Sequence, residues 1–274
     1  MKIQDNILKF YLKNCYFITG TAYAGKSTMC SMLSKKYNML HCEENYNMDT
    51  ILSVVDEQNQ PNLNYFNTMP SWQHYVSRTP KEFYDWYNGV SEEVAEFEVA
   101  ELIRLSGDRK VIVDTNIPLD TLHKIAEPNH VAVMLSPQSM SVASFFNRGD
   151  PEKQFLLKEI EKCSNPEAAF ENFKACIASV NSPEVYEAYL HSGFFTLIRE
   201  NTERDTREEV LQKLAEHFEL NCIKHRIGGV RLRRHLVLQK EYINELRKII
   251  SHRAGDARMH RACCELYAEQ KRRL

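Results

Sequence analysis

The chain has 274 residues, of which 43% are hydrophobic and 26% charged, and its formal net charge is −2. These values are ordinary for a globular enzyme, and every apolar run falls short of the roughly 18 residues that a membrane span needs. The amino end, Met1 to Asp5, does not read as a signal peptide. We therefore expect a cytoplasmic protein with no membrane partner, whose eight cysteines stay reduced.

The first predicted strand, residues 16–19, leads into a complete phosphate-binding pattern, G-x-x-x-x-G-K-[ST]. Its residues are Gly20, Thr21, Ala22, Tyr23, Ala24, Gly25, Lys26 and Ser27, followed by Thr28 and a helical pattern. Glycines let backbone N–H groups surround phosphate oxygens, Lys26 can reach the β- and γ-phosphates, and Ser27 can bind Mg²⁺. The motif predicts a bound nucleoside triphosphate with Mg²⁺.

The second predicted strand, residues 39–42, is followed by two acidic residues, Glu43 and Glu44. A carboxylate at this place can accept the proton of an attacking hydroxyl group opposite the γ-phosphate. The alternative is that both residues belong to an ordinary acidic turn.

Residues 45–107 form an insert rich in aromatic and amide side chains, including both tryptophans of the chain. Rings and amides suit a polar organic substrate, although the same residues also build small helical cores. The candidates for substrate binding are Tyr46, Trp72, Arg78 and Trp86. Later in the insert, the spacing of Glu93, Glu96, Glu98 and Glu101 predicts a solvated helix face.

The third predicted strand, residues 110–114, ends in the sequence Val-Ile-Val-Asp. An apolar strand that ends in Asp can place a carboxylate near Mg²⁺ and its waters, so Asp114 is the second candidate metal ligand beside Ser27. A cap or turn position is the alternative for Asp114.

The fourth predicted strand, residues 130–135, precedes a segment, 145–165, that we expect to act as a lid. Arg148 in this lid could stabilise the charge that develops on a transferred phosphoryl group. It could equally be a surface residue of an Asp-Pro turn.

A fifth strand is predicted at residues 194–198, and a capping box at Thr206 and Glu209 is expected to open the helix that closes the core. Five strands separated by helices indicate a parallel sheet of the α/β class with helices on both faces. Ligands of such sheets bind at the carboxyl ends of the strands.

The charge of the chain is unevenly distributed, because residues 221–274 carry 14 Lys and Arg against 5 Asp and Glu. We therefore place a boundary near residue 220, with a basic, helical C-terminal extension at 221–274. We favour docking of its helices onto the acidic core over nucleic-acid binding. Cys222, His225, His260 and Cys263 have spacings that could hold zinc, although their separation exceeds that of usual zinc fingers.

Together, these motifs resemble the P-loop kinase superfamily over residues 14–220, and Ser71-Trp72 with Arg78-Thr79-Pro80 is similar to a set of bacterial P-loop ATPases. The resemblance implies a three-layer α/β/α sandwich, ATP and Mg²⁺ as cofactors, and transfer of a phosphoryl group to a small-molecule acceptor. It also implies that residues 200–205 flank the adenine. The catalytic residues would be Lys26, Glu43 or Glu44, and Arg148.

We therefore expect an ATP-dependent small-molecule kinase, whose acceptor the sequence does not identify. The alternative is a nucleotide-dependent ATPase or switch, in which the basic extension binds a partner or a nucleic acid. A kinase should consume ATP rapidly only with its acceptor, whereas a switch should hydrolyse or hold ATP without one.

Overall fold

A computed structural model describes residues 3–137, 140, 145, 151–199 and 204–221 of the chain. Five strands form one sheet in the order β2-β3-β1-β4-β5, and all four strand pairs are parallel. The strands are β1 (Cys15–Gly20), β2 (Leu40–Cys42), β3 (Val111–Asp114), β4 (Val131–Leu135) and β5 (Phe195–Ile198). The predicted parallel five-stranded sheet of the α/β class is confirmed.

Helices make up most of the remaining described residues. They are α1 (Asp5–Tyr11), α2 (Lys26–Tyr37), α3 (Met48–Leu52), α4 (Pro61–Thr68), α5 (Trp72–Val76), α6 (Pro80–Ser106), α7 (Leu119–Ile125), α9 (Pro151–Glu161), α10 (Pro166–Ser179), α11 (Pro183–Leu190) and α12 (Arg207–His217), with a short 3₁₀ turn, η1, at Pro128–His130. None of the helices within these described ranges is long and apolar enough to cross a membrane.

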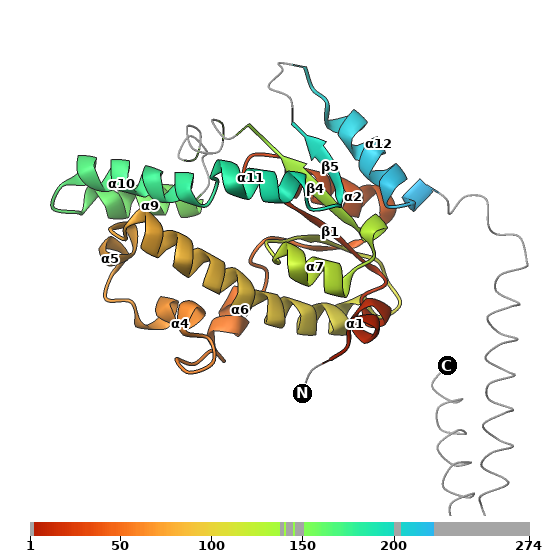
Figure 1. Ribbon diagram of the computed structural model, residues 1–274, viewed down its shortest axis with the longest axis horizontal. Coiled ribbons are helices and arrows are strands. Elements are labelled where there is room, and N and C mark those ends of the chain that lie inside the picture. The colour runs from red at the N-terminus through yellow and green to blue at the C-terminus, as the bar shows by residue number, and fades with distance from the viewer. Residues whose placement is uncertain (1–2, 138–139, 141–144, 146–150, 200–203, 222–274) are drawn as a thin grey trace, which may run out of the picture. The chain divides into compact units, whose positions relative to one another are not determined.

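Alternate side chains of the central strands face two separate cores, because successive residues of a strand point to opposite faces. Ile18 and Ala132 lie in the core beneath α2 and α12, whereas Phe17 and Val133 lie in the core beneath α1, α6 and α7. The residues of the three inner strands are all buried. The sheet is therefore covered by helices on both faces, as Figure 1 shows.

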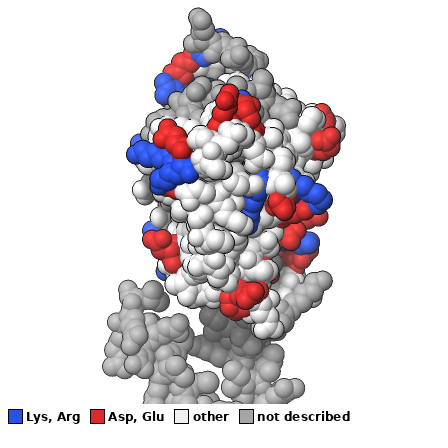
Figure 2. Space-filling model, turned by 90° about the vertical axis from the view of Figure 1, so that its left-hand side faces the viewer, with Lys and Arg blue, Asp and Glu red and all other residues white. Residues whose placement is uncertain are grey.

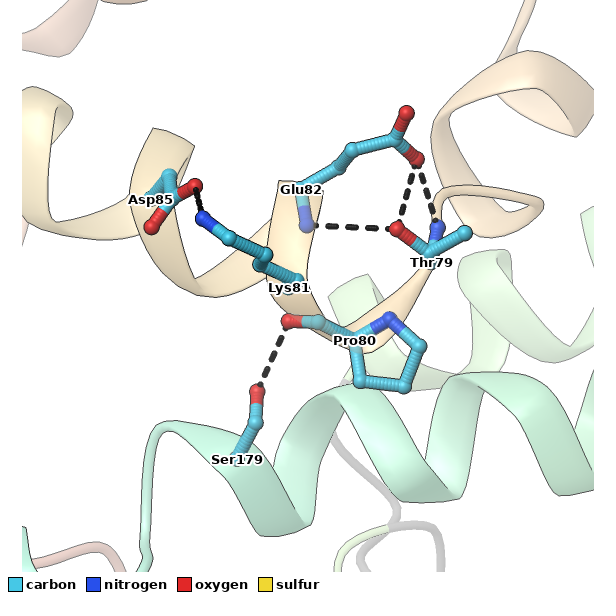
Figure 3. Close-up of polar contacts among 6 residues, drawn as sticks. All are labelled: Thr79, Pro80, Lys81, Glu82, Asp85 and Ser179. Atoms are coloured by element: carbon cyan, nitrogen blue, oxygen red, sulfur yellow. Dashed lines mark hydrogen bonds and ion pairs between the residues drawn. The ribbon is translucent and has the colours of Figure 1, made fainter.

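The insert predicted at residues 45–107 consists of four helices, α3 to α6. Its longest helix, α6, has 27 residues and begins at a capping box: the Thr79 hydroxyl accepts from the Glu82 N–H, and the Glu82 carboxylate accepts from the Thr79 N–H (Figure 3). The carboxyl-terminal half of α6 packs on the sheet, and its first half extends past the sheet to meet α4, α5, α9 and α10 (Figure 1).

Helices α4, α5, α9 and α10 and the first half of α6 enclose a core of their own, which we call the aromatic cluster. Its buried members are Tyr75, Val76, Phe83, Trp86, Ile160, Phe173, Cys176 and Ile177. Ring pairs such as Tyr75 with Trp86, whose centroids are 5.3 Å apart, meet edge to face, which is a favoured geometry for aromatic contacts.

The capping box predicted at Thr206 is wrong, because the Thr206 side chain makes no cap hydrogen bond with α12. Instead, the carboxylate of Asp205 accepts from the Arg207 N–H over 3.1 Å, so the preceding residue supplies the acceptor. The compact unit of described residues ends at Asn221. The extension at 221–274 and its candidate zinc ligands Cys222, His225, His260 and Cys263 fall, from residue 222 onward, outside the described residues.

Candidate active site

The phosphate loop connects β1 to α2 at the carboxyl edge of the sheet (Figure 1). Gly20, the last residue of β1, has a φ of +127°, and a Cβ atom there would lie 2.0 Å from the carbonyl oxygen of Met134 in β4. The next residue, Thr21, donates its backbone N–H to that same oxygen over 3.0 Å. Glycine is required at position 20 both by the backbone conformation and by the closeness of β4.

The loop turns into α2 through left-handed conformations at Tyr23 and Gly25, whose φ values are 66° and 93°. Gly25 is the N-cap of α2, and no side chain caps the helix there. The first N–H groups of α2 therefore have no capping side chain among the described residues, and they add to the positive end of the helix dipole. This arrangement is the backbone half of an anion site.

Lys26 opens α2 and is 9% exposed. Its ammonium nitrogen donates to the carbonyl oxygens of Gly20 and Thr21 over 3.3 and 3.4 Å, which are long contacts for a charged donor. Among the described residues no carboxylate forms an ion pair with Lys26, so its charge is available to an anion within the loop.

Ser27 and Asp114, the two predicted metal ligands, are in direct contact. The Ser27 hydroxyl donates to Oδ2 of Asp114 over 2.5 Å, and Asp114 is fully buried at the end of β3. Its second oxygen, Oδ1, is buried and has no hydrogen-bond partner among the described residues. Burial raises the pKa of Asp114, although the Lys26 charge and the Ser27 hydrogen bond act in the opposite direction.

These two oxygen donors fit a magnesium ion. Mg²⁺ prefers hard oxygen ligands and usually takes one or two from protein side chains, with waters and phosphates supplying the rest. No group of three His, Cys, Asp or Glu side chains in the described part of the chain is arranged to hold a metal. The orphaned Oδ1 of Asp114 gives such an ion a buried negative partner.

The chain beyond β3 adds contacts that the sequence analysis missed. The Thr115 hydroxyl donates to Oε2 of Glu98 over 2.7 Å and accepts from the Ile117 N–H over 3.0 Å. Burial, with further contributions from the nearby charges of Glu44 and Asp114, raises the pKa of Glu98 to about 7, even though the Thr115 hydrogen bond lowers it.

The prediction that Glu98 belongs to a solvated face of α6 is therefore wrong, since this residue is only 6% exposed. Glu98 follows Ala95 by three positions and precedes Leu102 by four, and both of these residues are buried in the core. This helical spacing was the signal that could have revealed its position. Glu93 is not free either, because its carboxylate accepts from the N–H groups of Asn62 and Leu63 at the start of α4.

The two glutamates after β2 differ in their surroundings. Oε1 of Glu44 accepts from the side-chain amide of Asn116 over 2.6 Å, which ties it to the segment that follows Asp114. The Glu43 side chain is 80% exposed, and one of its oxygens lies 4.0 Å from Nδ1 of His41. Only Glu44 is held towards the end of β3.

The β4 side of the loop is fixed by side chains that no motif indicated. Ser136, which follows β4, donates its N–H to the Thr21 hydroxyl over 2.8 Å and its own hydroxyl to the Ala22 carbonyl over 2.6 Å. Arg199, which follows β5, donates to the Tyr23 carbonyl over 2.6 Å. The loop is therefore held by the carboxyl ends of three neighbouring strands.

Other predicted positions cannot be placed at the site. Arg148 lies outside the described residues, as do residues 200–203 of the segment predicted to flank the adenine. From the predicted lid at 145–165, the structure describes Phe145 and the residues from Pro151 onward, most of them in α9. Phe145 and α9 contribute to the aromatic cluster.

The four predicted substrate residues are divided between two places. Tyr46 packs against the core beneath α1, α6 and α7. Trp72, Arg78 and Trp86 lie with the aromatic cluster, where the Arg78 guanidinium stacks on the Trp86 ring. The end of the molecule formed by α5, α9 and α10 carries few charged side chains at its centre (Figure 2).

Comparison with protein families and with curated proteins finds no match for the chain.

Proposed function

We propose that the protein binds ATP with Mg²⁺ and transfers the γ-phosphoryl group to a small-molecule acceptor. The observation that carries this proposal is the contact of Ser27 with the buried Asp114 beside the Lys26 ammonium. A glycine-bearing loop, a helix N-terminus, a cation and a hydroxyl–carboxylate pair are the parts from which a triphosphate site is made.

Each part has a task in phosphoryl transfer. The loop N–H groups and Lys26 bind the phosphate oxygens and stabilise the charge that spreads over them during transfer. Ser27 and Asp114 hold Mg²⁺, which when bound neutralises phosphate charge and orients the β- and γ-phosphates. Before Mg²⁺ binds, the Ser27–Asp114 hydrogen bond keeps the Ser27 hydroxyl and the Asp114 carboxylate next to each other.

We assign to Glu44 the role of general base towards the phosphoryl acceptor. Asn116 fixes one of its oxygens, and the other can accept the proton of an acceptor hydroxyl group. Glu43, Arg148 and the four predicted substrate residues Tyr46, Trp72, Arg78 and Trp86 stay predictions. The proposal does not depend on them.

The test is a screen of ATP consumption against nucleosides, nucleotides, sugars and amino-sugar antibiotics, with and without Mg²⁺. We expect one acceptor class to raise Mg²⁺-dependent turnover at least about a hundredfold over the acceptor-free rate. Asp114→Asn should lose this stimulation, whereas Asp120→Asn, on the exposed first turn of α7, should keep it.

ATP hydrolysis that is equally fast with every compound would contradict the kinase and favour the ATPase or switch. Absence of ATP binding would contradict the proposal altogether.

A further inference from the structure

A hollow of about 590 Å³ lies among α4, α5 and the beginning of α6. Asn62 and Tyr65 of α4, His74 of α5, and Asp85 and Trp86 of α6 line it, together with Arg78 from the turn between α5 and α6. Its volume falls within the range of small-molecule sites in proteins.

The hollow is not part of the phosphate-loop site. Trp86 and Glu98 are twelve residues apart on α6, which turns them about 120° from each other around the helix axis. Glu98 reaches Thr115 at the end of β3, whereas Trp86 donates its indole N–H to the Asn62 carbonyl in α4 over 3.0 Å. A ligand in the hollow would therefore contact a different side of α6.

Arg78 has an unusual environment in this hollow. Its guanidinium lies 3.8 Å from the ring centroid of Tyr65 and 4.6 Å from that of Trp86, and it forms no hydrogen bond or ion pair with any described residue. One of its nitrogens, Nη1, is buried and has no hydrogen-bond partner within the part of the chain that the structure describes. The other five described arginines each donate at least one hydrogen bond; they are Arg104, Arg109, Arg199, Arg204 and Arg207.

The parts around Arg78 are fixed in place. The side-chain amide of Asn172 and the thiol of Cys176 donate to the Arg78 carbonyl oxygen over 2.8 and 3.3 Å. The Tyr65 hydroxyl is hydrogen-bonded to Nδ1 of His74 over 2.8 Å, and the Trp86 indole is held by α4. Two anchored rings thus hold a guanidinium that donates no hydrogen bond to any described residue, which makes it a preorganised receptor for a carboxylate or another oxyanion.

Two carboxylates limit which anion fits. Asp85 lines the hollow and pairs with Lys81, while Glu82 uses only one of its oxygens in the capping box with Thr79 (Figure 3). The second oxygen of Glu82 is left for a ligand. The hydrogen bonds from Thr79 lower the pKa of this carboxyl, and the charge of Arg78 makes a smaller contribution in the same direction. A multiply charged anion would be repelled here, but a cationic group beside a carboxylate would be attracted.

We propose that this hollow is a second ligand site, which binds a small zwitterion with the chemistry of a free amino acid: Arg78 binds its carboxylate and Glu82 its ammonium group. The site does not depend on the proposed phosphoryl transfer, and Arg78 and Trp86 would then bind this ligand rather than the phosphoryl acceptor for which the sequence suggested them. Binding would satisfy the guanidinium, which has no hydrogen-bond partner among the described residues.

The test is calorimetric titration of the full chain with the common amino acids one at a time, with acetate, methylamine and inorganic phosphate as single-group probes. We expect at least one amino acid to bind saturably and at least about tenfold more tightly than every single-group probe. Arg78→Met should weaken that binding at least about tenfold, and Glu82→Gln, which can still accept from Thr79, should weaken it less.

Unfolding curves of both variants serve as the folding control, and if Arg78→Met does not fold, Glu82→Gln decides. The proposal is overturned if no amino acid binds, if phosphate binds as tightly as the best amino acid, or if neither folded variant loses affinity.

Discussion

At the carboxyl edge of the sheet the backbone positions the polar groups, whereas in the aromatic cluster side-chain packing does so. Gly20 and the Thr21 N–H hold the phosphate loop against Met134 of β4 through main-chain geometry, and the N–H of Ser136, directly after β4, adds a hydrogen bond to the Thr21 hydroxyl. In the aromatic cluster the rings pack against one another across helices that are far apart in the chain. Substitutions at the carboxyl edge of the sheet should therefore cause large losses of ATP turnover or of folding stability. Substitutions on the exposed surfaces of the helices should have little effect on either.

The largest effect is expected for Lys26→Ala at the edge. Loss of the ammonium removes the one charged group that lies within the loop, so ATP turnover should fall about 10³-fold or more. Single-turnover kinetics and ATP titration would measure the loss of rate and affinity separately. Lys35→Ala, an exposed lysine on the same helix, is the matched control and should behave as the wild type. Unchanged affinity and turnover in Lys26→Ala would show that this loop is not a nucleotide site.

A second prediction separates the two reasons for glycine in the loop. Gly20→Ala combines an unfavourable φ with a Cβ that would overlap the Met134 carbonyl, so it should lower the free energy of unfolding by about 4 kcal/mol. Gly25→Ala has the unfavourable φ but only a 3.9 Å contact with the Met134 side chain, and it should lower it by about 1–2 kcal/mol. Denaturant unfolding measures both. Equal losses of unfolding free energy in the two variants would mean that β4 shifts to make room for the methyl group of Ala at position 20.

The sequence predicted the edge well because the required spacing is local. All five strands and the loop follow from apolar runs and from one contiguous motif, and register then places Ser27 beside Asp114. Glu98 and Asn116 were not predicted to contribute, because their roles depend on the approach of α6 to β3 and of β2 to β3 across distant parts of the chain. Arg78 was a predicted substrate residue, but its stacking between rings of α4 and α6 depends on contacts between distant parts of the chain and could not be predicted.

A third prediction concerns the buried Glu98, which links α6 to the end of β3 through its hydrogen bond with Thr115. Its pKa is raised from 4.5 to about 7, so the folded protein keeps a proton that the unfolded chain has already released. Stability should therefore fall as the pH rises between these values, by up to about 3 kcal/mol from this group. Glu98→Gln can still accept from Thr115 and should remove that fall.

Unfolding free energies of the wild type and Glu98→Gln, measured from pH 4 to pH 8, would test this. The difference between them should grow in favour of the variant as the pH rises, whereas Glu96→Gln on the exposed side of α6 should follow the wild type. A pH-independent difference would show that the pKa of Glu98 is the same in the folded and the unfolded protein, so that other groups offset its burial.

The smallest expected effect distinguishes the two glutamates after β2, which the sequence left equivalent. Glu44→Gln can retain the hydrogen bond from Asn116 but loses the proton acceptor, so acceptor-dependent turnover should fall about tenfold. The fall is modest because a loose phosphoryl-transfer transition state needs little help from a base. Glu43→Gln, at a side chain that is 80% exposed, should leave turnover unchanged. If Glu43→Gln has the larger effect, the acceptor approaches from the solvent side of β2, and the contact between Glu44 and Asn116 only orders the segment after β3.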